Sequence, residues 1–392
     1  MIGIDDVSLK NKTVLVRVDY NISLDERHHI INDERIKQSL PTLELLLKNN
    51  NTLILLSHLG KPHGPEEKFS LKPVSLRLQQ LLPSVKIVFI EDFKDLVREK
   101  TRMDNPNVIF MLENIRFHKG EDANDLSFAK ELASFADVYV NDAFSVSHRE
   151  AASIVQLPTL LPSFAGILMK KEVEEISRII SSSKRPFVSL LGGAKISTKI
   201  KLLKKIITLS DEILLGGGLA NTFLLAKGIE IGHSLAEISE IKTAQHLLTF
   251  ASENTCSILL PVDAIVGDKQ GHNTQEVSIR NITKNDSIFD IGPQTQALYG
   301  AAILQAQTII WNGPFGVIEN PVYKRGTDFL YYTITQNPQA HSLVGGGETL
   351  AALSKKEDLD HITHISTGGG AMLSYIENGS LVGIDALNKQ QK

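Results

Sequence analysis

Four short glycine clusters in the second half of the 392-residue sequence are the features most suggestive of chemistry. Glycines between a strand and a helix let backbone N–H groups approach an anion, and the following helix points its positive end at that anion. A single cluster could be a tight turn, but four together predict a phosphate or nucleotide site. The sequence has neither a GxxxxGK(S/T) P-loop nor a GxGxxG dinucleotide fingerprint, so the site is of another type. The clusters are Gly192–Gly193, Gly216–Gly218, Gly345–Gly347 and Gly368–Gly370.

Charged residues beside these glycines indicate what the site could bind. Lys195 and Lys199 are four residues apart, which predicts that they share one face of a first helical turn. A cation there opposes the helix dipole by about 0.3–1 kcal/mol, so the placement makes sense if an anion lies between the lysines and the helix. The alternative is two solvated lysines. Glu348 could ligate Mg²⁺ or interact with a helix dipole, and Glu319 could bind ribose hydroxyls or be a surface residue.

A second group of candidates follows the apolar runs of the first half. Arginine presents a planar fork that matches phosphate and carboxylate, so several arginines at one sheet edge predict a pocket for a small, multiply charged anion. Asp19 and Asn21 add groups that could bind a hydroxyl. Each residue alone could be a surface ion pair or a structural histidine, and His118 is the weakest member. The basic candidates are Arg35, His58, Lys61, Arg116, His118, His148 and Arg149.

Short runs rich in Val, Ile and Leu must position these residues. Their continuous apolar character is typical of strands buried on both faces of a parallel sheet, and helical patterns alternate with them. We therefore expect an α/β protein with helices on both faces of its sheets and a boundary between two halves around residues 160–186. The runs span 14–21, 53–60, 86–90, 108–116, 137–144, 187–195, 212–221, 257–266, 308–317, 342–350 and 364–372.

The composition excludes several classes of protein. A hydrophobic fraction of 42%, a charged fraction of 22% and a net charge of −4 are ordinary for a globular protein and exclude wholesale disorder. The charge balance argues against binding to nucleic acid or to a membrane surface. The single Cys256 excludes a disulfide framework. No apolar stretch approaches ~18 residues and the beginning of the sequence lacks an apolar signal core, so we expect a cytoplasmic protein.

The sequence closely resembles the phosphoglycerate kinase family from about residue 9 to about residue 385. The resemblance rests on many motifs in the family's order, which makes it specific. The motifs are RVDYN at 17–21, SHLGKP at 57–62, FSLKPV at 69–74, ENIRFH at 113–118, VNDAF at 140–144, GGAKISTKI at 192–200, GGGLANTF at 216–223, LPVD at 260–263, DIGP at 290–293, WNGPFGVIE at 311–319, GGGET at 345–349 and STGGGA at 366–371.

The resemblance implies two Rossmann-like, doubly wound parallel-sheet domains, separated by a cleft and joined by a hinge helix. Residues 1–168 would bind the phosphoglycerate substrate, 169–376 would bind the nucleotide, and the tail from about 377 to 392 would return to the N-terminal domain. The implied reaction is 1,3-bisphosphoglycerate + ADP ⇌ 3-phosphoglycerate + ATP with Mg²⁺, by in-line transfer after hinge closure. The family is generally monomeric.

The resemblance also implies roles for individual residues. Because the acceptor carboxylate is already ionised at neutral pH, no general base is needed, and catalysis depends on alignment and charge neutralisation. The implied catalytic groups are Arg35, Lys195, Gly347 and Gly370. The implied substrate-binding residues are Asp19, Asn21, Arg35, His58, Lys61, Arg116 and Arg149. The implied nucleotide-binding residues are Lys195, Lys199, Gly217, Asn312, Glu319, Gly346, Gly347, Glu348 and Thr349, with Glu348 as the metal ligand.

Four positions depart from the family pattern. Lys61 replaces an arginine, Ser23 a proline, Ala151 a histidine and Glu348 the metal-binding aspartate. The extra methylene of Glu348 moves its carboxylate outward by about 1.5 Å, and Mg²⁺ tolerates little misplacement, so we expect an active enzyme with altered metal dependence. Two alternatives remain open: a catalytically impaired relative acting as a nucleotide sensor or docking module, and a nicotinamide-dependent dehydrogenase, against which the missing GxGxxG motif argues.

Overall fold

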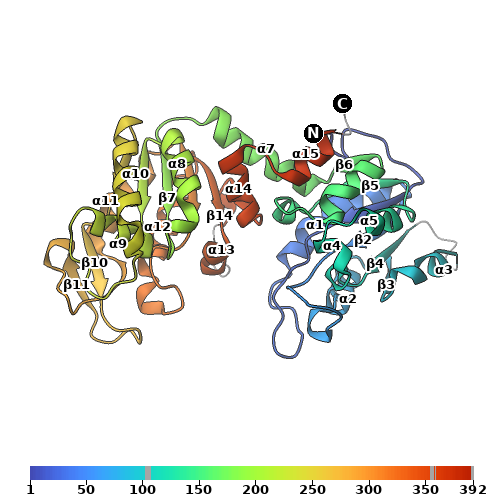
Figure 1. The fold of residues 1–392 in the computed structure, drawn as a ribbon, viewed down its shortest axis with the longest axis horizontal. Helices are drawn as coiled ribbons and strands as arrows, with labels where there is room; N and C mark the ends of the chain where they lie inside the picture. Colours follow the sequence, from blue (N-terminus) through green and yellow to red (C-terminus); the bar gives the residue numbers. More distant parts are fainter. Residues whose placement is uncertain (102–106, 354–356, 358, 390–392) are drawn as a thin grey trace. The chain divides into compact units, whose positions relative to one another are not determined.

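The computed structural model describes residues 1–101, 107–353, 357 and 359–389, and the chain forms two compact units. The first unit comprises Met1–Glu174 and Ser380–Lys392, of which 390–392 lie outside the described residues. The second unit comprises Glu175–Gly379. Helix α7 (Ile167–Ser182), in green in Figure 1, contains the division. The boundary predicted at 168/169 falls at the beginning of the same helix.

A parallel sheet of six strands forms the centre of the first unit, in the order β3-β4-β2-β1-β5-β6. The first strand lies inside the sheet, between β2 and β5. The chain adds β2, β4 and β3 on one side of β1 and then adds β5 and β6 on the other side. Ligands of open α/β sheets bind outside the carboxyl ends of strands at such a switch point. The strands are β1 (Thr13–Arg17), β2 (Thr52–Leu56), β3 (Lys86–Ile90), β4 (Val108–Leu112), β5 (Val138–Asn141) and β6 (Ser163–Ala165).

The helices of the first unit alternate with these strands, as the apolar runs predict. For example, α1 packs against β2 and α2 against β3. The strands β1, β2, β4 and β5 are almost wholly buried, which explains their continuous Val, Ile and Leu content. The helices are α1 (Glu34–Lys48), α2 (Lys72–Leu81), α3 (Leu96–Thr101), α4 (Lys119–Asp122), α5 (Leu126–Ala133), α6 (Leu157–Leu160) and the C-terminal α15 (Val382–Lys389).

The second unit repeats this arrangement with a parallel sheet in the order β15-β14-β13-β7-β8-β9. Its first strand, β7, again lies inside the sheet, so the switch point falls between β7 and β13. The predicted class of two doubly wound α/β halves is confirmed by these two sheets. The strands are β7 (Phe187–Leu191), β8 (Glu212–Leu215), β9 (Ser257–Leu259), β13 (Thr308–Asn312), β14 (His341–Gly345) and β15 (His364–Ser366).

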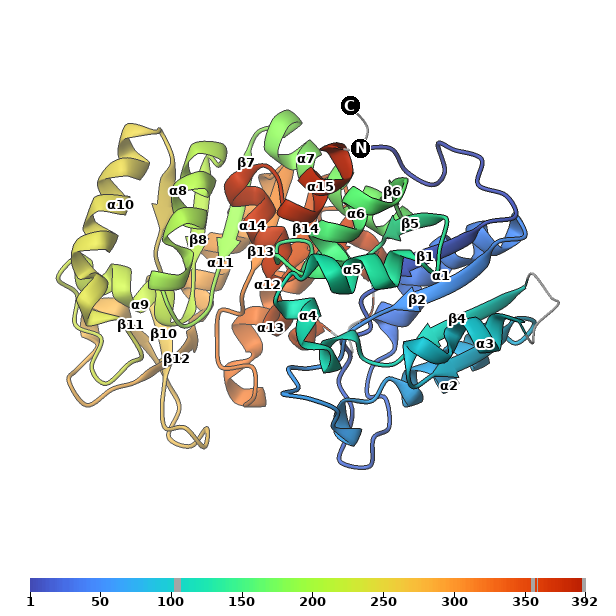
Figure 2. The same ribbon diagram turned by 45° about the vertical axis from the view of Figure 1, so that its right-hand side comes forward.

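The helices of the second unit begin directly after several of these strands (Figure 2). Both α9 and α13 begin at the second or third glycine of a cluster, and α14 begins at the last glycine of the fourth cluster. The helices are α8 (Ile200–Leu209), α9 (Gly217–Ala226), α10 (Ile241–Glu253), α11 (Pro293–Gln305), α12 (Arg325–Thr335), α13 (Gly347–Leu353) and α14 (Gly370–Asn378).

Two segments differ from the predicted pattern. The run 257–266 is not one strand: β9 ends before Pro261, which has no N–H to donate to a ladder, and β10 (Asp263–Val266) begins a separate antiparallel sheet with β11 (Gln275–Ser278) and β12 (Ile288–Ile291). The beginning of the predicted boundary region, around residues 160–186, contains the edge strand β6. The carbonyl of Pro162 accepts from the Tyr139 N–H at 2.9 Å, so this proline is compatible with an edge position.

The C-terminal segment packs on the first unit, beside α6 and β6 (Figure 2). The Gly383 N–H donates to the Ser147 carbonyl at 2.9 Å, and a side chain at Gly383 would collide with Ile154 and Ser147. Residues 380–389 therefore belong to the first unit although they follow the second in sequence. Within the described part of the chain, no helix has the length and apolar character needed to cross a membrane.

Candidate functional site

The switch point of the first sheet gathers several of the predicted anion-binding residues. Asp19 lies two residues beyond β1 and forms an ion pair with Arg35, which is in the first turn of α1. The same carboxylate accepts from the Ser145 hydroxyl, in the loop after β5, and from the Asn21 N–H at 3.0 Å. Asp19 therefore connects the loops that follow the two strands at the switch point.

His58 lies at the end of the neighbouring strand β2 and is buried. Its Nδ1 is 3.8 Å from Asp19 Oδ1, but this pair is not a salt bridge because burial and nearby cations hold the pKa of His58 well below its usual value. The imidazole is therefore neutral near pH 7. The structure brings together around it Arg17, Arg116, Arg35 and Arg149, the cations that lower its pKa.

The loop after β2 is fixed between two of the predicted residues. The Gly60 N–H donates to Asn21 Oδ1 at 2.8 Å, and Arg116 Nη1 donates to the Gly60 carbonyl at 2.8 Å. Arg116 Nε also lies 3.4 Å from Asp122, so this guanidinium is held on two sides. Lys61 follows Gly60 and its side chain is exposed. The four loops after β1, β2, β4 and β5 thus surround one cationic region.

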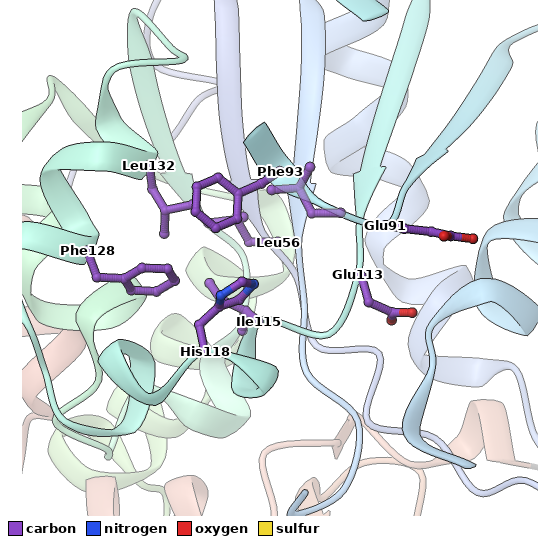
Figure 3. A pocket seen from close by; sticks show the side chains of 9 residues that line it. Leu56, Glu91, Phe93, Glu113, Ile115, His118, Phe128 and Leu132 are labelled. Atoms are coloured by element: carbon purple, nitrogen blue, oxygen red, sulfur yellow. The ribbon is translucent and has the colours of Figure 1, made fainter. Parts of the chain in front are cut away.

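The two remaining histidine candidates have different environments. His118 stacks on Phe128, with ring centroids 5.4 Å apart, and meets Phe93 edge to face at 5.0 Å. Figure 3 shows this aromatic group, which lines a small pocket. The volume of the pocket is about 10 Å³, barely enough for one water. The imidazole thus packs among aromatic rings, and burial lowers its pKa. His148 is half-buried beside Arg149, and burial and that charge lower its pKa.

At the switch point of the second sheet, the loops after β7 and β13 hydrogen-bond to each other. The Gly192 N–H donates to the Asn312 carbonyl at 2.9 Å and the Gly193 N–H to the Pro314 carbonyl at 3.0 Å. A Cβ at Gly192 would lie 2.1 Å from the Pro314 oxygen, and Gly313 has a φ of +92°. Close approach of two loops therefore requires these glycines.

Lys199 bonds to both of these loops. Its Nζ donates to the Gly192 carbonyl at 2.6 Å and to Asn312 Oδ1 at 2.9 Å. Asn312 Nδ2 in turn donates to the Gly345 carbonyl at 2.8 Å, which defines the orientation of the amide. Burial lowers the pKa of Lys199 to about 8, opposed by the charge of Glu348. The ammonium is only partly solvated and an anion placed beside it would meet a poorly shielded charge.

Lys195 and Lys199 do not share a helical face, contrary to the prediction. The α-helix begins at Ile200, after a 3₁₀ segment, Ser197–Lys199. Because Lys195 and Lys199 both precede the α-helix, a spacing of four residues does not place them on one helical face. Lys195 is exposed in the preceding loop. Glu237 fixes that loop by accepting from the Ser197 N–H at 2.9 Å and hydroxyl at 2.6 Å, and its carboxylate attracts Lys195.

A small apolar surface lies next to the glycine loops. The Gly217 N–H donates to the Phe315 carbonyl at 3.2 Å, and Gly217 has a φ of +64°. A Cβ on Gly218 would be 3.2 Å from the side chain of Leu235, which is 60% exposed. Asn221 Nδ2 donates a hydrogen bond to the Leu235 carbonyl at 3.0 Å. An exposed apolar side chain therefore lies against the glycine backbone at the beginning of α9.

The third and fourth glycine clusters contribute backbone N–H groups at helix beginnings. Gly347 begins α13 and Gly370 begins α14. A Cβ on either residue, or on Gly369, would meet no atom within 4 Å, so these positions adjoin open space. Gly346 has a φ of +110°, which favours glycine. The Thr349 hydroxyl is buried and accepts from the Gly313 N–H at 2.8 Å, so its side chain joins the third cluster to the β13 loop.

The two glutamates of the predicted nucleotide site are exposed. Glu348 is in the first turn of α13 and attracts Lys199, and Glu319 is in the loop between β13 and α12. The described residues include no group of three or more acidic, histidine or cysteine side chains able to hold a metal ion. A lone carboxylate fits Mg²⁺ that keeps most of its ligands from water and phosphate.

Sequence reasoning missed a buried network next to the cationic region of the first unit. Arg17, the last residue of β1, is 1% exposed, and it contacts Ser153 and the buried Glu121. An arginine at the end of an otherwise apolar strand is the signal that could have identified it, because a charge is buried only when it has partners.

The LPVD and DIGP motifs have a structural role. Asp263 accepts from the Gln294 N–H at 2.9 Å and the Thr295 N–H at 2.8 Å, at the beginning of α11. Asp290 accepts from the Gly326 N–H at 2.7 Å, in the first turn of α12, and burial raises its pKa to about 7. Both carboxylates therefore cap helices.

Comparison with known proteins agrees with this arrangement over the whole chain. The family model described as phosphoglycerate kinase matches residues 4–379. The chain is 42% identical to the phosphoglycerate kinase of Dictyoglomus turgidum, over 99% of this chain and 98% of that protein. It is 41% identical to the enzyme of the same name from Helicobacter pylori, over 99% and 97%.

A solved structure shows the same similarity in three dimensions. The structure of phosphoglycerate kinase from Coxiella burnetii superposes with a TM-score of 0.89, at 37% sequence identity and with complete coverage of both chains. Matches of this identity and coverage in sequence and structure show that the chain belongs to the phosphoglycerate kinase family.

Proposed function

We propose that this chain catalyses the reversible transfer of a phosphoryl group between 1,3-bisphosphoglycerate and ADP, which yields 3-phosphoglycerate and ATP. The observation that supports it most directly is the pair of switch-point sites: an arginine-rich region in one unit and a glycine-and-lysine region in the other. The named relatives are all phosphoglycerate kinases, which favours the enzyme over the nucleotide sensor.

The first unit would bind the glycerate substrate. Its arginines offer charge-assisted hydrogen bonds to phosphate and carboxylate oxygens, and the neutral His58 offers a further ring N–H. Asp19 and Asn21 would hold the substrate hydroxyl. The proposed contacts are Asp19, Asn21, Arg35, His58, Lys61, Arg116 and Arg149.

The second unit would bind the nucleotide. The base would lie on the apolar surface of Gly217 and Leu235, because a flat ring needs contact area and few charges. Glu319 would accept from ribose hydroxyls. The phosphates would lie against Lys195, Lys199 and the N–H groups of the third glycine cluster. The proposed contacts are Lys195, Lys199, Gly217, Asn312, Glu319, Gly346, Gly347, Glu348 and Thr349.

Transfer itself would depend on position and charge. The acceptor is a carboxylate, ionised at neutral pH, so no residue need remove a proton. Lys195, Arg35 and the N–H groups of Gly347 and Gly370 would neutralise the three equatorial oxygens of the moving phosphoryl group. In-line transfer needs the two substrates at reaction distance, and we propose that the units close during turnover, with α7 as the hinge.

Glu348 would be the protein's own ligand to Mg²⁺. The ion would arrive with the nucleotide and supply charge neutralisation between phosphate oxygens. We expect Glu348→Asp to lower the Mg²⁺ concentration that gives half-maximal rate several-fold, because the shorter side chain restores the usual carboxylate position. Glu276→Asp, on the exposed strand β11, is the control. Rates measured at fixed ATP over a range of free Mg²⁺ decide the matter: identical curves for wild type and Glu348→Asp would contradict the assignment.

Nucleotide affinity is expected to fall as pH rises through about 8. The pKa of Lys199 is lowered to about 8 in the free protein, and a bound phosphate would raise it by favouring the cation. Binding then takes up a proton above pH 8, so the Kd for ADP rises up to tenfold per pH unit there. Titration calorimetry between pH 7 and 9 measures this slope. Lys199→Arg, which stays charged, should show a flat profile. A flat wild-type profile would contradict the role of Lys199.

One assay tests the function as a whole. The purified chain is mixed with 3-phosphoglycerate and ATP, and 1,3-bisphosphoglycerate is followed through a coupled dehydrogenase, with and without Mg²⁺. Turnover dependent on all three supports the proposal. Binding of ADP without turnover would support the sensor instead. We further propose that the enzyme acts in the cytoplasm as a monomer. Gel filtration of the purified chain tests the oligomeric state.

A further inference from the structure

Arg17 lies behind the anion-binding region and each part of its guanidinium has an acceptor. Nε donates to the Ser153 hydroxyl at 2.9 Å and Nη1 to the Val18 carbonyl at 2.5 Å. Nη2 lies 3.4 Å from His58 Nδ1. The side chain is 1% exposed, so water does not compete for these positions.

The partners of Arg17 are themselves fixed. The buried Glu121 accepts from the Ser153 N–H at 2.9 Å and from its hydroxyl at 2.6 Å, and its Oε1 lies 3.9 Å from Arg17 Nη2. The Tyr139 hydroxyl donates to the Ser153 carbonyl at 2.5 Å. These contacts hold the guanidinium with its Nη2 toward His58.

This contact decides where the proton of His58 lies. A guanidinium only donates, so the facing Nδ1 must present its lone pair and the ring proton must be on Nε2. The competing acceptor is Asp19 Oδ1, which would favour a proton on Nδ1. It is 3.8 Å away, outside hydrogen-bond distance, and already accepts from the Asn21 N–H.

We propose that Arg17 is a positioning residue that holds His58 as the neutral tautomer protonated on Nε2, so that His58 offers the glycerate substrate an N–H donor without a charge. This inference rests on the proposed function for the identity of the anion. The charged groups that face His58 are Arg17, Arg35, Arg116, Arg149 and Asp19.

A neutral donor suits this region physically. With four arginines acting on it, a protonated His58 would add like-charge repulsion in a buried place. The Nε2–H group still forms a hydrogen bond to an anion. The state of His58 therefore stays the same across the physiological pH range, and substrate affinity does not depend on its titration.

The first test uses the wild-type chain without substrate. Histidine is labelled with ¹⁵N, and the ring nitrogens are followed by long-range ¹H–¹⁵N correlation from pH 8 to pH 6. His58→Gln assigns the signal among the 12 histidines. We expect His58 to give the neutral pattern with a proton on Nε2 throughout. A proton on Nδ1, or titration to the charged form within this range, would overturn the proposal. Neither result depends on kinase activity, so a failure of the proposed function is seen separately.

The second test removes the donor. Arg17→Met should let His58 populate the neutral tautomer protonated on Nδ1, because burial and the other three arginines still disfavour the cation. The loss of the Nε2–H donor should raise the KM for 3-phosphoglycerate, with a smaller change in kcat. Because this substitution leaves Glu121 without its cation, Arg17→Met combined with Glu121→Gln provides a neutral network if the single variant does not fold. Arg27→Met, at an exposed arginine, is the control. A folded Arg17 variant with the wild-type tautomer of His58 and the wild-type KM for 3-phosphoglycerate would contradict the role of Arg17.

Discussion

Replacing Lys195 with alanine is expected to lower kcat by about 10²–10³-fold, while the KM for each substrate changes only a few-fold. Removal of one group that stabilises developing charge typically has an effect of this size on kcat. Lys195 is exposed in a loop that Glu237 fixes through Ser197, so its ammonium can meet the phosphoryl oxygens as they move. In the proposed role this interaction would be stronger in the transition state than in either ground state, so the loss should fall on kcat.

Two other lysines provide the comparison for this prediction. Lys199→Ala removes a cation that is bound to the Gly192 carbonyl and to Asn312, so it should raise the KM for nucleotide more than it lowers kcat. Lys201→Ala, on the exposed face of α8, should leave both constants unchanged. Initial rates with each substrate varied in turn give the separate constants. If Lys195→Ala weakens the binding of both substrates equally and leaves kcat intact, the assignment of Lys195 is wrong.

The sequence predicted the parts of the fold that depend on continuous burial. The apolar runs mark eleven of the twelve strands in the two parallel sheets, all except β6, because a strand covered on both faces has no need of polar alternation. The glycine clusters predicted the loops after β7, β8 and β14, since close backbone approach and positive φ angles leave few other residues possible.

Features that depend on contacts between distant segments escaped this reasoning. The spacing of Lys195 and Lys199 suggested a shared helical face, but Glu237, about forty residues further along the chain, holds Ser197 and the helix begins only at Ile200. The run 257–266 crosses from one sheet to another at Pro261. Local pattern carries no information about such partners.

The two switch points explain why the candidate residues were recognisable from type but not from sequence spacing. At each one, the loop after the first strand of the sheet hydrogen-bonds to the loop after a later strand: Asp19 with Ser145, and Gly192 with Asn312. The residues in each pair are more than one hundred positions apart. Their chemistry suggested an anion site in each half. Within each half, only the order of the strands in the sheet shows that the two residues of a pair lie together.

Replacing Arg35 with alanine should reduce kcat/KM for 3-phosphoglycerate by about 10²–10³-fold. A hydrogen bond from a charged donor contributes about 1.5–3 kcal/mol, and each 1.4 kcal/mol is a factor of ten. The loss is larger than the bond alone because Arg35 is the ion-pair partner of Asp19. Without it, the Asp19 carboxylate, which keeps its Ser145 and Asn21 donors, repels the incoming anion.

A second substitution separates these two contributions. Asp19→Asn in the Arg35→Ala background removes the repelling charge and keeps a polar side chain, so it should recover about tenfold of the loss. Initial rates at varied 3-phosphoglycerate, with ATP saturating, measure the recovery for wild type, both single variants and the double variant. Were the double variant no better than Arg35→Ala, repulsion by the Asp19 charge would not explain any of the loss. Were Arg35→Ala to raise only the KM for ATP, the first unit would not be the glycerate site, because Arg35 and Asp19 both lie at its switch point.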